Sequence, residues 1–235
     1  MIIVIIILAT VAVFASWMLV EKPVLRCLAG SLSLFIFVGS IAMLTNHFVN
    51  HTGMSVKTSE KTKEIYSAAG ADSPFGLLIK KEVGSDSNNY VLAYRDKPSD
   101  KDATAHFIPK TDEPTEAVKQ RVTYKEADVD KATVTTITKR YTWKSDFAKL
   151  LYGFGGEDGE LISREVTATV PKDTWLVVTK NQADKLPDIA KKLQDENAKA
   201  NPKAAAALQK LAKENPQAVV TKQVEDLKTA LKEEK

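Results

Sequence analysis

The sequence predicts a membrane-anchored α+β protein with an N-terminal transmembrane helical hairpin, a mainly antiparallel β soluble domain and short C-terminal helices. Residues 1–20 and 27–45 contain no Asp, Glu, Lys or Arg. From residue 75 the chain consists of short runs rich in β-branched and aromatic residues, and after residue 180 apolar residues recur at helical spacing. The domain boundaries expected from these changes are 1–50, 51–74, 75–180 and 181–235.

The composition excludes several classes of protein. Charged residues make up 27% of the 235 residues, which is too many for a polytopic transporter. The 33 Lys and Arg residues nearly balance the 30 Asp and Glu residues, and the net charge of +3 lacks the basic character of a dedicated nucleic-acid binder. The single cysteine, Cys27, cannot form a disulfide within the chain.

The two apolar segments predict membrane-spanning helices at 1–20 and 27–46. At ~1.5 Å per residue the first gives about 30 Å of helix, which is enough to cross the hydrocarbon core of a bilayer. Residues 21–26 carry three charges and a proline and form the turn. A cleavable signal peptide is the main alternative, but it would begin with a basic region and have a shorter apolar core.

Processing and lipidation of this region are alternatives to the hairpin. Ser40 and Ala42 resemble a small-residue cleavage site at the end of the second run, so cleavage there stays open. A lipoprotein role for Cys27 is disfavoured because Arg26 occupies a position that requires a small residue. Cys27 is expected to be a buried small side chain near the membrane boundary.

Basic residues near the apolar segments predict the orientation in the membrane. Lys22 and Arg26 lie in the turn, whereas Lys57, Lys61 and Lys63 lie farther from the second segment and are interleaved with acids. Because Lys and Arg close to spanning helices favour the cytoplasmic side, we expect the turn inside the cell and the C-terminal domain outside it. The absence of cysteine after residue 27 suits an extracytoplasmic domain in the cell envelope.

A linker and a β domain are expected after the hairpin. Residues 51–74 are rich in Ser, Thr, Ala and Gly and predict a flexible, partly helical linker. Apolar and polar residues alternate in 161–170, which is typical of an antiparallel strand with one face on a core. A short helix at 146–152, ending at Gly153, interrupts the strands. Seven strands are expected, at 75–83, 90–95, 104–109, 121–124, 132–143, 161–170 and 174–179.

The C-terminal region predicts three short helices that dock along the sheet or a partner. Asn-Pro pairs at 201–202 and 215–216 separate them, with Asn as the cap and Pro in the first turn. The apolar stripes are too narrow for a stable domain on their own. They consist of Leu186, Ile189, Ala190 and Leu193, then Leu208 and Leu211, then Val220, Val224, Leu227 and Leu231.

The histidines at the end of the second apolar segment are candidate ligands. His47 and His51 would share one helix face together with Asn46 and Asn50. A zinc site needs at least a third protein ligand, which the sequence does not supply, so polar decoration of a membrane interface is the favoured interpretation. His106, on an expected strand, is interpreted as structural. A glycosylation sequon at 50–52 lies close to the membrane.

The glycine-rich loop at 153–160 holds the candidate acid/base residues Glu157, Asp158 and Glu160. It lacks the Lys-Ser/Thr of a phosphate-binding loop and the ligand pattern of a calcium loop. A solvated turn is favoured. The alternative is a hydrolase acting on envelope material with these carboxylates as acid and base.

No nucleophile stands in a recognised catalytic context. Tyr141, Trp143 and Trp175 are expected to pack on the sheet, with a binding groove as the alternative. No catalytic or cofactor-binding residue, no metal and no cofactor are predicted. The expected partners are the lipid bilayer and a membrane protein, without nucleic acid.

Three segments resemble a family of bacterial membrane proteins, found mainly in lactic-acid bacteria, that is catalogued as domain of unknown function 4811. They are SWMLVEKPVLR at 16–26, NHFVNHTGM at 46–54 and YTWKSDFAKLLYGFGGEDGELISREVTATVPKDTW at 141–175. The resemblance covers residues 1 to about 180 and implies no established activity or binding residues. It implies a transporter partner, since members tend to be encoded beside drug-efflux transporters. We therefore expect a non-enzymatic anchored protein that presents an interaction domain, accessory to a transporter or envelope complex.

Overall fold

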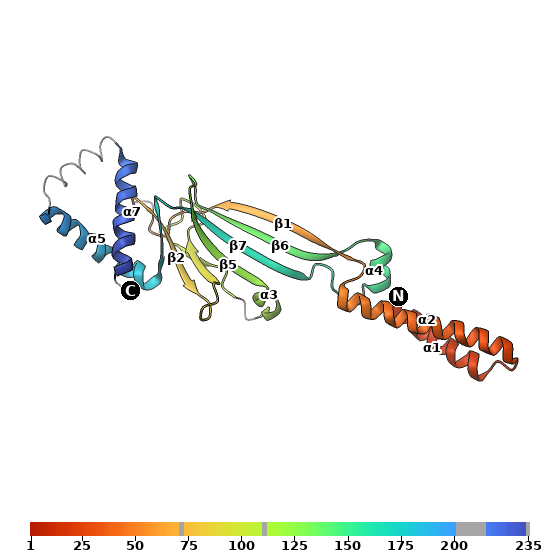
Figure 1. Cartoon of the computed structure of the whole chain (residues 1–235). Coiled ribbons are helices and arrows are strands. Elements are labelled where there is room, and N and C mark those ends of the chain that lie inside the picture. The colour runs from red at the N-terminus through yellow and green to blue at the C-terminus, as the bar shows by residue number, and fades with distance from the viewer. Residues whose placement is uncertain (71–72, 110–111, 201–214, 234–235) are drawn as a thin grey trace. The chain divides into compact units, whose positions relative to one another are not determined.

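The computed structural model has an α+β fold and describes residues 1–70, 73–109, 112–200 and 215–233 (Figure 1). The described chain divides into two compact units. Unit 1 comprises Met1–Ser59 and Lys139–Ile162, and unit 2 comprises Glu60–Thr138 and Ser163–Lys235.

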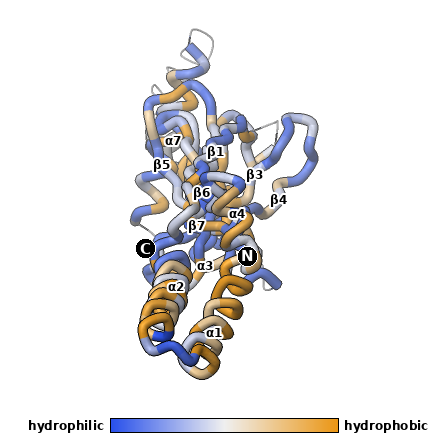
Figure 2. Tube along the Cα trace, turned by 90° about the vertical axis from the view of Figure 1, so that its right-hand side faces the viewer, coloured by the Kyte–Doolittle hydropathy of each residue, from blue (hydrophilic) through white to orange (hydrophobic). Residues whose placement is uncertain are grey.

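Two apolar helices, α1 (Ile2–Met18) and α2 (Pro23–Asn50), begin unit 1 and lie side by side (Figures 1 and 2). Pro23 suits the first turn of α2, where no backbone donor is needed, and His51 ends the helix in the left-handed conformation with φ 51°. Within the described residues, α2 is the one helix long and apolar enough to cross a membrane. Helix α1 is also apolar but has 17 residues.

The buried face of α2 is made of small and polar residues. Gly30, Ser33, Ser40 and His47 are buried, whereas Phe35 is 76% exposed. A Cβ atom on Gly30 would lie 2.5 Å from Nε1 of Trp17, so only glycine permits this approach of α1. Large apolar side chains are therefore exposed along both helices, and Figure 2 shows that apolar residues predominate in them.

Two four-stranded sheets follow, with strand orders β1-β6-β7-β5 and β4-β3-β2-β8. All seven expected strands are confirmed as β2 to β8. The bounds are β1 Met54–Glu64, β2 Gly76–Glu82, β3 Tyr90–Tyr94, β4 Thr104–His106, β5 Gln120–Ala127, β6 Thr133–Trp143, β7 Leu161–Pro171 and β8 Trp175–Thr179.

The prediction of a mainly antiparallel domain is corrected to mixed sheets. Strands β2 and β3 pair antiparallel, as do β3 and β4, but β2 pairs parallel with β8 and β5 pairs parallel with β7. The alternation within a strand reports which face is buried and carries no information about the direction of the neighbouring strand.

The prediction of a linker at 51–74 was wrong for Met54–Glu64, which form strand β1. This strand lies at the edge of its sheet, and every side chain from Lys57 to Glu64 is exposed. With no apolar alternation to detect, its KTSEKTKE sequence resembles a solvated linker. Exposed lysines suit an edge strand because they discourage pairing with another chain. A short helix, α3 (Pro114–Val118), was not predicted.

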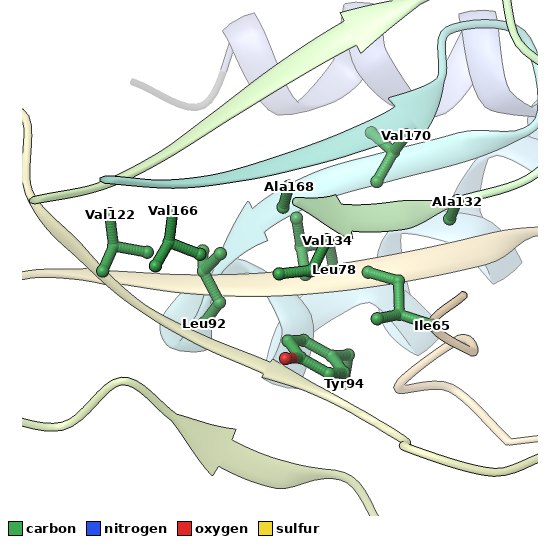
Figure 3. Close-up of a cluster of buried hydrophobic side chains, with 10 residues drawn as sticks. All are labelled: Ile65, Leu78, Leu92, Tyr94, Val122, Ala132, Val134, Val166, Ala168 and Val170. Atoms are coloured by element: carbon green, nitrogen blue, oxygen red, sulfur yellow. The ribbon is translucent and has the colours of Figure 1, made fainter. Parts of the chain in front are cut away.

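Strand β2 is buried on both faces in unit 2. Leu78 belongs to a core of ten residues between the strands: Ile65, Leu78, Leu92, Tyr94, Val122, Ala132, Val134, Val166, Ala168 and Val170 (Figure 3). Leu77 points to the opposite face, where it packs in a second core with Leu176 and Val178. Helices therefore cover the second face of this sheet.

The covering helices are α5 (Lys180–Ala200) and α7 (Pro216–Glu233). Their buried residues belong to the first and third predicted stripes: Leu186 and Ile189 of α5, and Val224, Leu227 and Leu231 of α7. Docking along the sheet is thus confirmed for these two helices. The second stripe, Leu208 and Leu211, lies outside the described residues. Helix α4 (Asp146–Tyr152) matches its prediction, with the Ser145 side chain capping Ala148 N.

Candidate functional site

His47 connects two candidate regions that lie far apart in the sequence, namely the end of α2 and the glycine-rich loop at 153–160. Its ring is 1% exposed, its Nε2 lies 2.8 Å from Glu157 Oε2, and its Nδ1 lies 2.8 Å from the carbonyl oxygen of Thr52. The ring stacks on Tyr152 at 4.3 Å between centroids and on Trp143 at 5.6 Å. We call these five residues, His47, Thr52, Trp143, Tyr152 and Glu157, the His47 site.

The hydrogen bonds of His47 restrict where its protons lie. A carbonyl oxygen can only accept, so Nδ1 carries a proton and donates it to Thr52. The contact between Nε2 and Glu157 then holds one further proton, either as an imidazolium facing a carboxylate or as a neutral ring facing a protonated carboxyl group. The site is therefore a closed pair that fixes the end of α2 to the loop after α4.

The two histidines do not form a metal-binding pair. Both ring nitrogens of His47 have protein partners, and His51, just after the last turn of α2, stacks on Tyr141 with 4.0 Å between centroids. Asn50 donates to Asn46, which donates to Thr52 Oγ1 at 2.7 Å. Within the ranges given above, no group of three or more His, Cys, Asp or Glu side chains could hold a metal ion.

The acidic loop does not gather its carboxylates. Glu157 binds His47, whereas the side chains of Asp158 and Glu160 are exposed. Gly156 and Gly159 have φ of 73° and 81°, so the turn depends on glycine at these positions. The Glu160 backbone carbonyl accepts from Tyr141 N at 2.9 Å, which aligns the loop with the end of β6.

The helix α4 contacts the beginning of α1 within unit 1. The amino group of Met1 donates to the carbonyl oxygens of Leu150 and Leu151, at 2.9 and 3.1 Å. These carbonyls belong to the last turn of α4, where a cation is favourable. Ile2, Leu151 and Tyr152 form a small buried core beside this contact. Tyr152 belongs to both this core and the His47 site, and burial raises the pKa of its phenol.

The aromatic residues expected on the sheet do not line one groove. Tyr141 stacks on His51 and Trp143 on His47, both in unit 1. Trp175 lines a cavity of about 470 Å³ in unit 2, together with Tyr66, Phe75 and Arg95. We call it the Arg95 cavity. The sequence does not reveal this cavity, because Arg95 directly follows a short strand and has no local pattern that distinguishes it from a surface cation.

His106 packs in a charged group in unit 2. Its ring stacks on the buried Tyr94 at 3.9 Å, and its Nε2 lies 3.6 Å from Asp96, which accepts from Lys63 at 2.5 Å. Burial lowers the pKa of His106, against the opposing effect of Asp96. The hydrogen bond from Lys63 lowers the pKa of Asp96. Burial raises the pKa of Tyr94, whose hydroxyl has no hydrogen-bond partner among the described residues.

Comparison with known proteins places this architecture in a family. The sequence model described as Domain of unknown function (DUF4811) matches residues 22–186. The chain belongs to this family. The DUF4811 match runs from the turn before α2 into α5, so it includes the whole His47 site and Arg95, Tyr66, Phe75 and Trp175 of the cavity. No curated protein and no solved structure matches the chain.

The His47 site leads to a stability prediction. Replacing Glu157 with Ala leaves the buried Nε2 of His47 without a partner, so the free energy of unfolding should fall by about 1–3 kcal/mol. Chemical denaturation in detergent, followed by tryptophan fluorescence, measures this loss. Asp158→Ala is the matched control, because this neighbouring side chain is exposed, and its effect should stay within about 0.5 kcal/mol. Equal losses in the two variants would contradict the assigned role of Glu157.

His106 leads to a prediction about pH. Its folded-state pKa lies below the ordinary value of 6.5, so the unfolded chain binds more protons and stability should fall as the pH drops below about 6.5. Subtracting the stability profile of His106→Gln from that of the wild type isolates this contribution. In an NMR titration, Asp96→Asn should lower the His106 pKa further because it removes a charge that raises it. An unchanged or raised His106 pKa in Asp96→Asn would refute this assignment.

Proposed function

We propose that this protein is a non-enzymatic, two-pass membrane protein that presents an extracytoplasmic interaction domain, accessory to a transporter or another cell-envelope complex. The observation that carries the proposal is the arrangement of side chains on α1 and α2. The residues that α2 buries are small or polar, whereas most large apolar residues of both helices are exposed.

This arrangement is unfavourable in water and favourable in lipid. A pair of helices in water gains most of its stability by burying an apolar stripe, whereas helices in a bilayer pack through small residues because lipid already surrounds their apolar surface. Phe35, Leu28 and Val38 of α2 are 76%, 67% and 56% exposed. Helix α1, with 17 residues, is at the lower limit of the spanning length. Leu19 and Val20 extend its apolar sequence.

Exposed apolar residues continue from α2 onto α4. Phe147 and Leu150 of α4 are 70% and 60% exposed, and Phe154 contacts Phe48 of α2 edge-on, with 6.1 Å between ring centroids. Phe48 is itself half exposed. A short helix with this character suits the boundary between acyl chains and headgroups, where aromatic side chains concentrate. We therefore place α4 in the interfacial layer of the outer leaflet.

The orientation follows from the turn between α1 and α2. Lys22 and Arg26 are the basic residues closest to both helices, and Arg26 is held there by a 2.8 Å bond from its Nε to the Val20 carbonyl. Basic residues in short loops favour the cytoplasmic side. Unit 2 then lies outside the cell.

An interaction role suits the soluble region better than the hydrolase alternative. Glu157 is engaged with His47, Asp158 and Glu160 are exposed, and none of the three lines the Arg95 cavity. A glycosidase needs two carboxyl groups facing each other across a substrate. The tether to the membrane would keep unit 2 close to a membrane-embedded partner.

Cysteine accessibility tests the anchor and its orientation together. In a Cys27→Ala background, a membrane-impermeant thiol reagent should label Ser87→Cys in intact cells, and Lys22→Cys only after the membrane is permeabilised. Phe35→Cys should stay unreactive in both cases, although Phe35 is exposed to its surroundings, because lipid excludes the polar reagent. Labelling of Phe35→Cys would refute the membrane anchor, and labelling of Lys22→Cys alone in intact cells would reverse the orientation.

The interaction role has a separate test. After extraction in a mild detergent, the tagged chain should co-purify with one membrane protein at a constant ratio, because a tethered domain gains affinity from its high local concentration. The control is the same tag on residues 1–53 alone, which should not retain the partner. A partner-free monomer in repeated preparations would contradict the role.

A further inference from the structure

The Arg95 cavity contains a buried cation that has no acidic partner among the described residues. Arg95 is 5% exposed and follows the last residue of β3. Its backbone exchanges both hydrogen bonds with Tyr66, at 2.9 and 3.0 Å, as in an antiparallel bridge. This bridge fixes the backbone from which the guanidinium extends and places Arg95 beside Tyr66, which also lines the cavity.

Three backbone carbonyls hold the guanidinium in place. Nε donates to Ser67 O at 2.6 Å, and Nη1 donates to Pro98 O and Asp100 O at 3.2 and 3.0 Å. Carbonyl dipoles satisfy donors without neutralising the positive charge. In the described part of the chain no carboxylate pairs with Arg95, and Nη2 donates to no protein atom.

The acids nearest in sequence are engaged elsewhere. Asp96 accepts from Lys63, and the carboxylate of Asp100 accepts from the backbone N–H of Lys97 at 2.9 Å. A buried charge without a counter-ion is unfavourable, and Nη2, which donates to no described protein atom, can donate to an oxygen of a carboxylate or phosphate group. The charge of Arg95 is thus available to an anion that enters the cavity.

The other walls of the cavity combine aromatic and aliphatic surface with polar side chains, among them Ser73, Thr174 and Gln217. A Cβ atom on Gly76 would overlap the indole of Trp175, so the ring lies directly on the glycine backbone. Phe75 and Tyr66 add aromatic surface, and Val220 of α7 adds an aliphatic side chain. The volume of about 470 Å³ lies within the range of small-molecule sites, roughly 300–1,000 Å³.

We propose that the Arg95 cavity binds a small amphipathic anion, in which an aromatic or compact apolar group carries a carboxylate or phosphate. The anionic group pairs with the guanidinium of Arg95, and the apolar group packs against Trp175. The three carbonyls preorganise the guanidinium, so binding requires little ordering of the arginine side chain. This inference depends on unit 2 alone and holds whichever way α1 and α2 meet the membrane.

Fluorine NMR of the full chain in lipid nanodiscs tests this site. The chain has three tryptophans, Trp17, Trp143 and Trp175, and 5-fluorotryptophan gives one resonance for each, assigned by Trp→Phe variants. Benzoate should shift the Trp175 resonance saturably and leave the other two in place. Benzamide has the same shape without the charge and should bind at least tenfold more weakly. Equal binding of the two probes, or no saturable shift with benzoate, would overturn the proposal.

Two variants localise the binding. Val220→Phe fills the cavity from α7 and should weaken benzoate binding at least tenfold. Val219→Phe is the matched control, since this neighbouring residue does not line the cavity, and it should retain binding. Arg95→Lys keeps the charge but loses the guanidinium that the three carbonyls hold in place, and it should also weaken benzoate binding relative to benzamide. Circular dichroism checks that each variant is folded, and unchanged benzoate affinity in Val220→Phe would place the ligand elsewhere.

Discussion

A helix in lipid gains little by hiding apolar side chains, and under the proposed membrane anchor this constraint accounts for the organisation of unit 1. Ser33, Ser40 and His47 recur every seven residues on the buried face of α2. The stripe that packs small side chains against α1 thus ends in the one ring that needs polar partners. At that level Thr52 and Glu157 supply the polar partners, and Tyr152 of α4 and Trp143 of β6 supply the aromatic stack. His47 is buried because it continues the helix-packing face beyond the apolar segment.

Elements with strong local signals were predictable from the sequence. Helix α4 has a capping serine at its start and a glycine at its end, and both signals are local. Strands β2 to β8 carry β-branched and aromatic residues because at least one face of most of them packs on a core. Strand β1 contributes edge hydrogen bonds and exposes its side chains, so its sequence carries no such signal. Parallel pairing also depends on distant segments, such as β2 with β8.

The candidate sites were predictable only in part, for the same reason. His47 and Glu157 were each identified as residues able to carry chemistry, but 110 positions separate them and no local spacing brings them together. The metal hypothesis placed His47 and His51 on one helix face. Helix α2 ends at Asn50, however, and His51 adopts the left-handed conformation, which directs its ring to Tyr141. Arg95 owes much of its environment to distant segments, which supply Tyr66, Ser67 and Trp175. The residue type alone does not show whether an arginine is buried or lies on the surface.

The two faces of β2 connect the fold of unit 2 to its proposed ligand. Gly76 begins the strand and accommodates the Trp175 indole, while Leu77 and Leu78 point into different cores. Helix α7 is held on one of these cores by Val224 and Leu227, and the same helix places Val220 at the cavity. The family match ends at residue 186, before α7. In the proposed site, the groups that would bind the anion and stack on its ring therefore belong to the DUF4811 domain, and a wall that limits ligand size comes from the C-terminal helix.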